Sequence, residues 1–175
     1  MAERSVSYAR DLASWFWRLV TLRPHQLIGN EGEGLNVDHV YLRRWFLVPS
    51  NHVFNVYLHH FKASDDDRAL HDHPWDSVSI LIKGELLEHV DTLPGISAST
   101  DVLPRVIHHR APAIVNRTAE HTHRLELIGG NPAWTIFITG RKRRRWGFWC
   151  KTGWMHWKVF TAHDGTGRSM GCGDE

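Results

Sequence analysis

Two histidines separated by one residue, His71 and His73, are the residues of this sequence whose spacing most directly suggests chemistry. In an extended strand successive side chains point to opposite faces, so the two imidazoles share a face and Asp72 points away from them. Two imidazoles on one face can bind one metal ion, and imidazole suits iron, nickel, copper, zinc and, less strongly, manganese. Because fourteen histidines make such a pair easy to obtain by chance, a metal site requires a third ligand.

A second histidine cluster, His121 and His123, lies further along the chain. His123 has the same strand parity as Leu125 and Leu127, which predicts that its side chain faces the interior. A histidine from this hairpin can reach the first pair only if the sheet curls on itself, as in a small barrel. We therefore predict that the first pair and His123 form one metal site, with His121 as the alternative third ligand.

The segments that would position these histidines are mostly short strands. Branched and aromatic residues recur with the two-residue period of a strand, and turn residues such as those at 129–132 separate the runs. The predicted strands are 40–48, 53–61, 77–83, 85–90, 105–110, 113–116, 123–128 and 133–139, followed by a Trp-rich pair that ends near residue 157. Either His59 or His60 is expected to face inward. This pattern predicts a mainly β sandwich or barrel and not a βαβ fold.

An amphipathic helix is predicted over residues 5–22. Its apolar positions fall on one face, which we expect to pack on the rest of the protein; they are Leu12, Trp15, Phe16, Leu19 and Val20. A membrane-surface helix is the alternative, but the polar side carries Asp11 and few lysines. Residues 21–38 read as a loop. The predicted organisation is an N-terminal helix and loop packed on the barrel (1–38), the barrel (39–162) and a flexible, glycine-rich tail (163–175).

Composition excludes several classes of protein. A formal charge of +2 is too small to indicate nucleic-acid binding by itself. No run is long and apolar enough to predict a membrane span, and charged residues interrupt the N-terminal segment, so no signal peptide is predicted. Cys150 and Cys172 show no CxxC motif and no disulfide framework, which predicts unpaired cysteines, a reducing compartment and a cytoplasmic location.

The spacing of the histidine motifs resembles that of a cupin, the double-stranded β-helix jelly-roll family. In that family two histidines one residue apart precede a glutamate and, six residues later, a glycine. His71, His73 and Gly84 match, whereas Ser77 stands in the place of the glutamate. The family's second motif centres on a histidine that His123 matches best. The resemblance covers roughly residues 53–140.

The chain resembles more closely the uncharacterised cupin-like proteins with an HDHPW core and an R-x-WGF-x-C/H-x-x-GW tail. This resemblance implies a single jelly-roll barrel. Cysteine dioxygenase-type cupins also lack the glutamate and hold iron with three histidines, which leaves positions open for substrate and oxygen. The missing carboxylate leaves the site one positive charge higher, which favours an anionic, chelating substrate.

The resemblance makes iron(II) the favoured ion, with zinc, manganese and nickel as alternatives, and Glu88 a substitute ligand. Arg124 is the candidate for binding a substrate carboxylate, because a guanidinium can form two parallel bonds to it, although its strand parity opposes that of His123. Trp75 and Ser77, beside the first motif, are the other residues that we expect near a substrate.

The basic run Arg141–Arg145 has two interpretations. Five aromatic residues follow it, namely Trp146, Phe148, Trp149, Trp154 and Trp157. Charge beside stacking rings is typical of a nucleic-acid surface, but a charged turn before Trp-rich strands that cover the barrel is the favoured interpretation.

Three functional hypotheses follow. The favoured one is a cytosolic metal-binding cupin that acts as an iron-dependent oxygenase, a dioxygenase, on a small anionic substrate. The second is a non-catalytic cupin module that binds a small ligand or a protein partner. The third is nucleic-acid binding through residues 141–157. The sequence leaves the oligomeric state open, a homodimer included.

Overall fold

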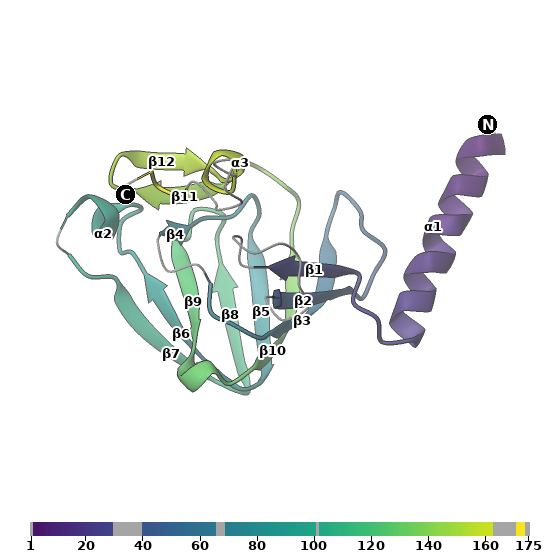
Figure 1. Ribbon diagram of the computed structural model, residues 1–175, viewed down its shortest axis with the longest axis horizontal. Coiled ribbons are helices and arrows are strands. Elements are labelled where there is room, and N and C mark those ends of the chain that lie inside the picture. Colours follow the sequence, from purple (N-terminus) through teal and green to yellow (C-terminus); the bar gives the residue numbers. More distant parts are fainter. Residues whose placement is uncertain (1, 30–39, 66–68, 101, 163–170, 174–175) are drawn as a thin grey trace.

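The protein folds into two antiparallel β-sheets that face each other (Figure 1). The computed structural model describes residues 2–29, 40–65, 69–100, 102–162 and 171–173, with side chains from residue 11 onward. Among these residues the first sheet has the order β1 (Gln26–Gly29), β2 (Val40–Phe46), β3 (Asn55–Phe61), β10 (Ala133–Thr139), β5 (Ser77–Lys83) and β8 (Ala113–Arg117). The second has the order β12 (Gly153–His156), β11 (Gly147–Cys150), β4 (Leu70–His71), β9 (His123–Leu127), β6 (Glu85–Val90) and β7 (Arg105–Arg110).

The sheets pack through one apolar cluster that draws on both of them. Its buried members are Leu42, Phe61, Leu81 and Ala133 from the first sheet and Leu86 and Leu127 from the second. Each occupies an alternate position on its strand, because a strand with one face buried presents every second side chain to the core. The predicted mainly β jelly-roll fold is thereby confirmed.

Gly84 forms the corner at which the chain passes from one sheet to the other. It separates β5 of the first sheet from β6 of the second and has a φ of 91°, a left-handed conformation that favours glycine. A Cβ atom at this position would lie 2.8 Å from the carbonyl oxygen of Pro132. Both the backbone conformation and the neighbouring chain therefore require glycine here.

Four elements lie outside the predicted ones. β1 falls within the segment expected to be a loop, and it forms because Leu27 and its neighbours pair with the edge of β2. The short helices α2 (Ile96–Ser99), η2 (Ile128–Gly130) and α3 (Trp157–Phe160) were not predicted either. They are single turns that follow strands, too short to produce a helical period in the sequence.

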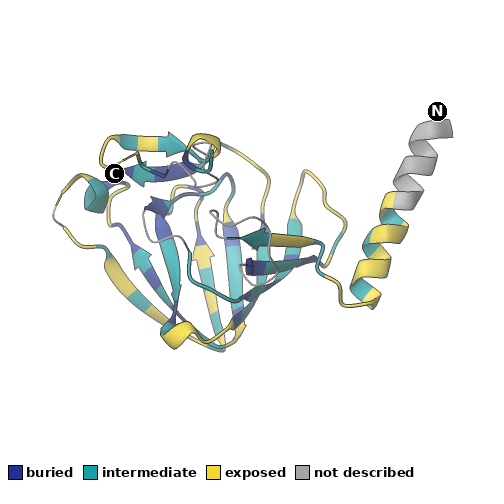
Figure 2. Ribbon diagram, viewed as in Figure 1, coloured by how far each residue is buried: buried dark blue, intermediate teal, exposed yellow. Residues whose placement is uncertain are grey.

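The predicted N-terminal helix is present as α1 (Ala2–Val20) and is set to one side of the sheets (Figure 1). Trp15 Nε1 donates a hydrogen bond of 2.7 Å to the carbonyl oxygen of Phe46 at the end of β2. Phe16 and Val20, on the face expected to pack, are 61% and 59% exposed (Figure 2), because the helix reaches the barrel only near that strand end. No described helix is long and apolar enough to cross a membrane.

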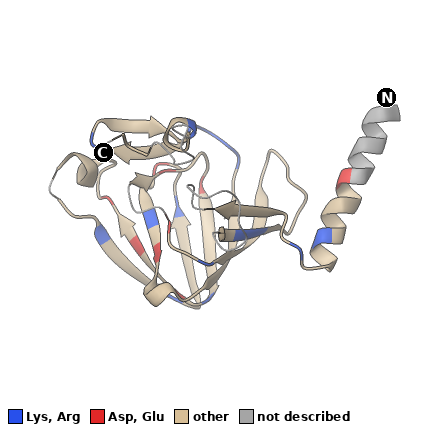
Figure 3. Ribbon diagram, in the orientation of Figure 1, with Lys and Arg blue, Asp and Glu red and all other residues tan. Residues whose placement is uncertain are grey.

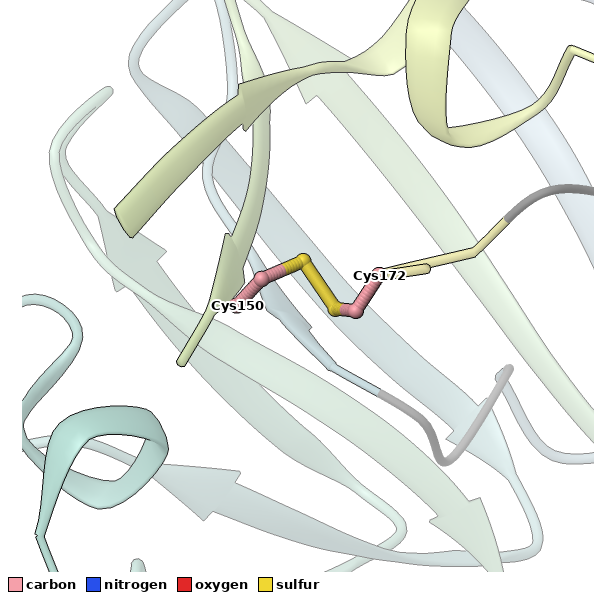
Figure 4. Close-up of a disulfide and its surroundings, with 2 residues drawn as sticks. All are labelled: Cys150 and Cys172. Atoms are coloured by element: carbon pink, nitrogen blue, oxygen red, sulfur yellow. A yellow bond between two sulfur atoms is a disulfide. The ribbon is translucent and has the colours of Figure 1, made fainter. Parts of the chain in front are cut away.

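The prediction of unpaired cysteines is wrong. Cys150 at the end of β11 and Cys172 form a disulfide (Figure 4), and the amide of Gly171 donates to the carbonyl of Phe160. The disulfide holds residues 171–173 of the supposed flexible tail against β11, while residues 163–170 and 174–175 lie outside the described residues. Because disulfides are rare in reducing compartments, the cysteines do not support a reducing compartment, and a cytoplasmic location stays a prediction.

Candidate metal centre

The rings of His71, His73 and His123 come together inside the barrel. The nitrogen atoms that they could offer to a metal all lie within 4.8 Å of one another, and His73 Nε2 lies 3.0 Å from His123 Nε2. His71 ends β4 and is the register partner of His123 on β9, so sheet pairing brings together residues that are distant in sequence. Three imidazole nitrogens at this separation form a candidate metal site.

Asp72 fixes the first motif from the opposite side. Its carboxylate is 1% exposed and accepts hydrogen bonds from the backbone amide of Gly147 at 2.9 Å and from Trp154 Nε1 at 3.0 Å. Arg144 Nη2 lies 3.0 Å from the same carboxylate. The side chain between the two histidines therefore points away from them, as the sequence predicted, and attaches their strand to β11 and β12.

Glu88 on β6 orients His123. Its Oε1 atom accepts a 2.6 Å hydrogen bond from His123 Nδ1 and another of 2.6 Å from Arg117 Nε, which leaves His123 Nε2 directed toward the other two rings. Burial alone would raise the pKa of Glu88, but hydrogen bonds from His121, His123 and Arg117 outweigh it and hold the pKa well below its usual range. A carboxylate behind a histidine is a common support for a metal ligand.

Burial favours the neutral form of two candidate ligands, His73 and His123. Burial is the main cause that lowers the pKa of His123 to about 3, against the opposing hydrogen bond from Glu88. Burial, followed by the neighbouring His71 and His123, holds the pKa of His73 well below its ordinary value. Neutral imidazole is the form that binds a metal, so these two rings are in the metal-binding form at neutral pH.

His121 and Glu88, the alternative ligands, form with His123 a second group whose candidate ligand atoms lie within 4.8 Å. His121 Nε2 is 3.0 Å from Glu88 Oε1. Glu88 already interacts with four side chains, because its Oε2 also lies 2.7 Å from His109 Nε2. As a metal ligand it would have to give up some of these bonds, which makes the three-histidine group the better candidate.

A cavity of about 80 Å³ adjoins the three histidines. Polar side chains that we had not predicted for the site also line it, namely Tyr41, Arg44, Asp65, Ser79, Arg117 and Thr135. His59 lines it as well and is 3% exposed, so His59 and not His60 faces inward. The period of β2 and β3 places Arg44 and His59 on alternate inward positions, but only their cross-strand pairing shows that they meet.

No protein-family model matches the sequence, and no curated protein sequence matches it. Solved structures do match. A sugar phosphate isomerase of the cupin superfamily from Silicibacter pomeroyi aligns over 71% of this chain and 76% of its own, at 16% identity and a TM-score of 0.50. A cupin superfamily protein from Desulfitobacterium hafniense aligns over 67% of this chain and 99% of its own, at 12% identity and a TM-score of 0.44. The fold of the protein is cupin-like. At these identities the likeness concerns the fold and not the activity.

In this cupin-like barrel Ser77, which stands in the place of the family's glutamate, faces the interior from β5 and is 5% exposed. Its hydroxyl forms no hydrogen bond with any described residue, and neither does the buried indole nitrogen of Trp75. Neither residue lines the cavity beside the histidines. Ser77 contributes no negative charge, so the three-histidine group remains without the carboxylate that the family motif would add.

Arg124, the predicted carboxylate-binding residue, lies on the other face of β9 from His123. Its Nη1 is 3.7 Å from Glu126 Oε2, and it does not line the cavity. Two arginines of the basic run, which connects β10 with β11 (Figure 3), are also engaged within the fold. Arg143 Nη2 lies 2.7 Å from Asp76 Oδ1, and Arg144 reaches Asp72. These contacts support a structural interpretation of the run.

Proposed function

We propose that this cupin-like protein binds one divalent transition metal through His71, His73 and His123, with iron(II) favoured, and acts as an oxygenase on a small anionic substrate. One observation carries the proposal: three imidazoles offer nitrogens within 4.8 Å of one another, and a buried carboxylate orients one of them. Iron(II) held by these three histidines would supply the redox chemistry that activates oxygen, and the substrate would be the group that is oxidised.

The residues of the chain would have three tasks. Glu88 would fix the tautomer of His123, because a carboxylate that accepts from Nδ1 leaves Nε2 free for a metal. Asp72 would hold the strand of the first two ligands through its bonds to β11 and β12. The small cavity would restrict bulk water around the bound substrate.

The charge of the site supports an anionic substrate. The three histidines would add no negative charge around a divalent metal, Ser77 adds no carboxylate, and the negative charge of Glu88 is shared with Arg117. Arg44 also lines the cavity. A substrate that carries a negative charge would balance these positive groups.

The test is the metal content of protein purified without an affinity tag and loaded with iron(II) without oxygen. We expect about one equivalent per chain and a higher melting temperature with metal, because binding to the folded state stabilises it. His73→Ala should abolish both effects. It is a cleaner variant than His123→Ala, which also breaks the bond to Glu88.

His108→Ala is the matched control. His108 lies on β7, is paired with Glu85 and has a side chain that is 43% exposed, so its loss should leave the metal content unchanged. Less than about a tenth of an equivalent in the wild-type protein would contradict the proposed function. Oxygen uptake by the loaded protein, measured over a panel of small thiols and carboxylic acids, then separates an oxygenase from a non-catalytic metal-binding module.

A further inference from the structure

Arg44 borders the same cavity as the three histidines but comes from the opposite sheet. It lies on β2 and pairs in register with His59 on β3, whereas His71 and His123 lie on β4 and β9 of the second sheet. The cavity is lined by Arg44 on one side and by the candidate metal ligands on the other. A small molecule that fills the cavity would contact both.

The guanidinium of Arg44 is held in place by neutral groups. Its Nε donates a 2.8 Å hydrogen bond to His59 Nε2, and its Nη1 donates a 3.2 Å bond to Gln26 Oε1. Its central carbon lies 4.9 Å from the ring centre of Tyr57, a cation–π distance. Burial, followed by the positive charge of Arg44, holds the pKa of His59 well below its ordinary value, so His59 remains a neutral acceptor.

No carboxylate among the described residues pairs with Arg44. The contrast is Arg117, which lines the same cavity but lies 2.6 Å from Glu88 Oε1. A guanidinium has five N–H donors, and the described contacts of Arg44 use two of them. Charged groups inside proteins are normally paired. An inward-facing, half-buried cation beside a cavity, with N–H donors that no described residue accepts from, therefore indicates a site for an anion.

We propose that Arg44 binds the carboxylate of the substrate while the rest of the molecule reaches across the cavity toward His71, His73 and His123. This inference rests on the proposed function and names the substrate class. Two parallel N–H bonds from a guanidinium match the two oxygens of a carboxylate. His59 is a positioning residue, because it fixes the guanidinium through Nε and leaves the other nitrogens free to bind the anion.

The size of the cavity limits the substrate. A cavity of about 80 Å³ has room for only a few water molecules. The part of the substrate inside the barrel is therefore a short carboxylic acid with a second donor group for the metal. A long chain or a sugar ring would have to extend outside.

Glycolate is a suitable probe, because it carries a carboxylate and a neighbouring hydroxyl that can chelate a metal. Its neutral counterpart, glycolamide, has the same shape without the charge. Binding of both is measured by calorimetry with cobalt(II)-loaded and with metal-free protein, and the cobalt absorption spectrum reports whether the ligand reaches the metal. The metal content of every variant is measured in parallel.

Arg44→Gln should weaken glycolate binding about tenfold or more, as expected for the loss of charged hydrogen bonds, with unchanged metal content. Arg44→Lys keeps the charge but cannot form the two parallel N–H bonds, so it should give an intermediate affinity. It provides the test if the glutamine variant does not fold. Arg43→Gln is the matched control: Arg43 is the adjacent residue on the other face of β2 and should have no effect. Glycolamide should bind more weakly to the wild-type protein and equally to all variants.

The outcomes separate the two proposals. Equal glycolate affinity in the wild type and Arg44→Gln, at equal cobalt content, would overturn the role of Arg44 and leave the metal site intact. A wild-type protein that binds cobalt but no glycolate would also overturn it. If the protein binds no metal but the metal-free form binds glycolate only when Arg44 is present, the anion site stands and the proposed oxygenase function fails.

Discussion

The regions around Glu88 and Arg44 border the same interior but differ in how their charged side chains are paired. Glu88 is 1% exposed and is surrounded by Arg117, His121, His123 and His109. Arg44 has only neutral partners among the described residues. In the first region the buried carboxylate has hydrogen-bonding partners on both oxygens, as expected of a residue that holds a metal ligand in place. In the second region no described carboxylate pairs with the buried charge, which fits the anion site that we propose.

The largest difference should appear in stability when Glu88 is neutralised. Glu88→Gln removes the charge that Arg117 and the histidines share, and breaking a buried ion pair costs about 3–5 kcal/mol of unfolding free energy. Urea unfolding followed by circular dichroism measures this loss. Glu85→Gln is the control: Glu85 lies on the same strand with its side chain 37% exposed, and its change should affect stability far less, because exposed ion pairs contribute little. A similar small effect at Glu88 would remove the contrast between the regions.

The disulfide belongs to neither region, so its loss should affect stability without affecting binding. Replacing Cys150 and Cys172 together by serine opens a link between residues separated by 22 positions, which should cost about 3 kcal/mol. Unfolding with and without reductant should give the same difference in the wild-type protein. Metal content and glycolate affinity should remain at wild-type values; a loss of either would show that the link supports the site.

Lowering the pH should reduce the unfolding free energy through the titratable groups around Glu88. The fold lowers the pKa of His123 to about 3 from 6.5, so the unfolded chain binds more protons than the folded one below pH 6.5, and stability falls as the pH falls. Glu88 adds a loss in the same direction below pH 4.5. Between about pH 7 and about pH 5 the metal-free protein should lose about 2 kcal/mol of unfolding free energy from His123. Urea unfolding at these pH values tests this, and a constant free energy would contradict it.

The smallest effect on stability is expected at Arg44. Arg44→Gln breaks the bonds to His59 and Gln26 and the contact with Tyr57 but removes no ion pair with a described carboxylate, so the unfolding free energy should change by only about 1–2 kcal/mol. Comparison with Glu88→Gln under the same conditions makes the contrast quantitative. A loss as large as that of Glu88→Gln would mean that Arg44 supports the fold and is not held ready for a ligand.

The sequence predicted the parts of the site that depend on local period. The two-residue spacing placed His71 and His73 together with Asp72 opposed, and the parity of His123 with Leu125 placed its ring inward. These relations depend only on the alternation of side chains along a strand. The convergence of the three rings then followed from the resemblance to a closed barrel.

The parts that the sequence did not predict depend on which strands become neighbours. Glu88 lies behind His123 because β6 pairs with β9, and Arg44 meets His59 because β2 pairs with β3. β1 and the disulfide likewise join segments without a local signal. The chain alone gives the face of each residue, but the partner across the barrel depends on a register that no short motif encodes.

The central claim is that three histidines, and not the neighbouring group that contains Glu88, bind the metal. A crystal structure of the iron-loaded protein, with anomalous scattering recorded at the iron edge, tests this most directly. We predict one anomalous peak at about 2.0–2.2 Å from a nitrogen of each of His71, His73 and His123, with Glu88 bonded to His123 Nδ1. A peak between Glu88, His121 and His123, or no peak within the barrel, would contradict the account.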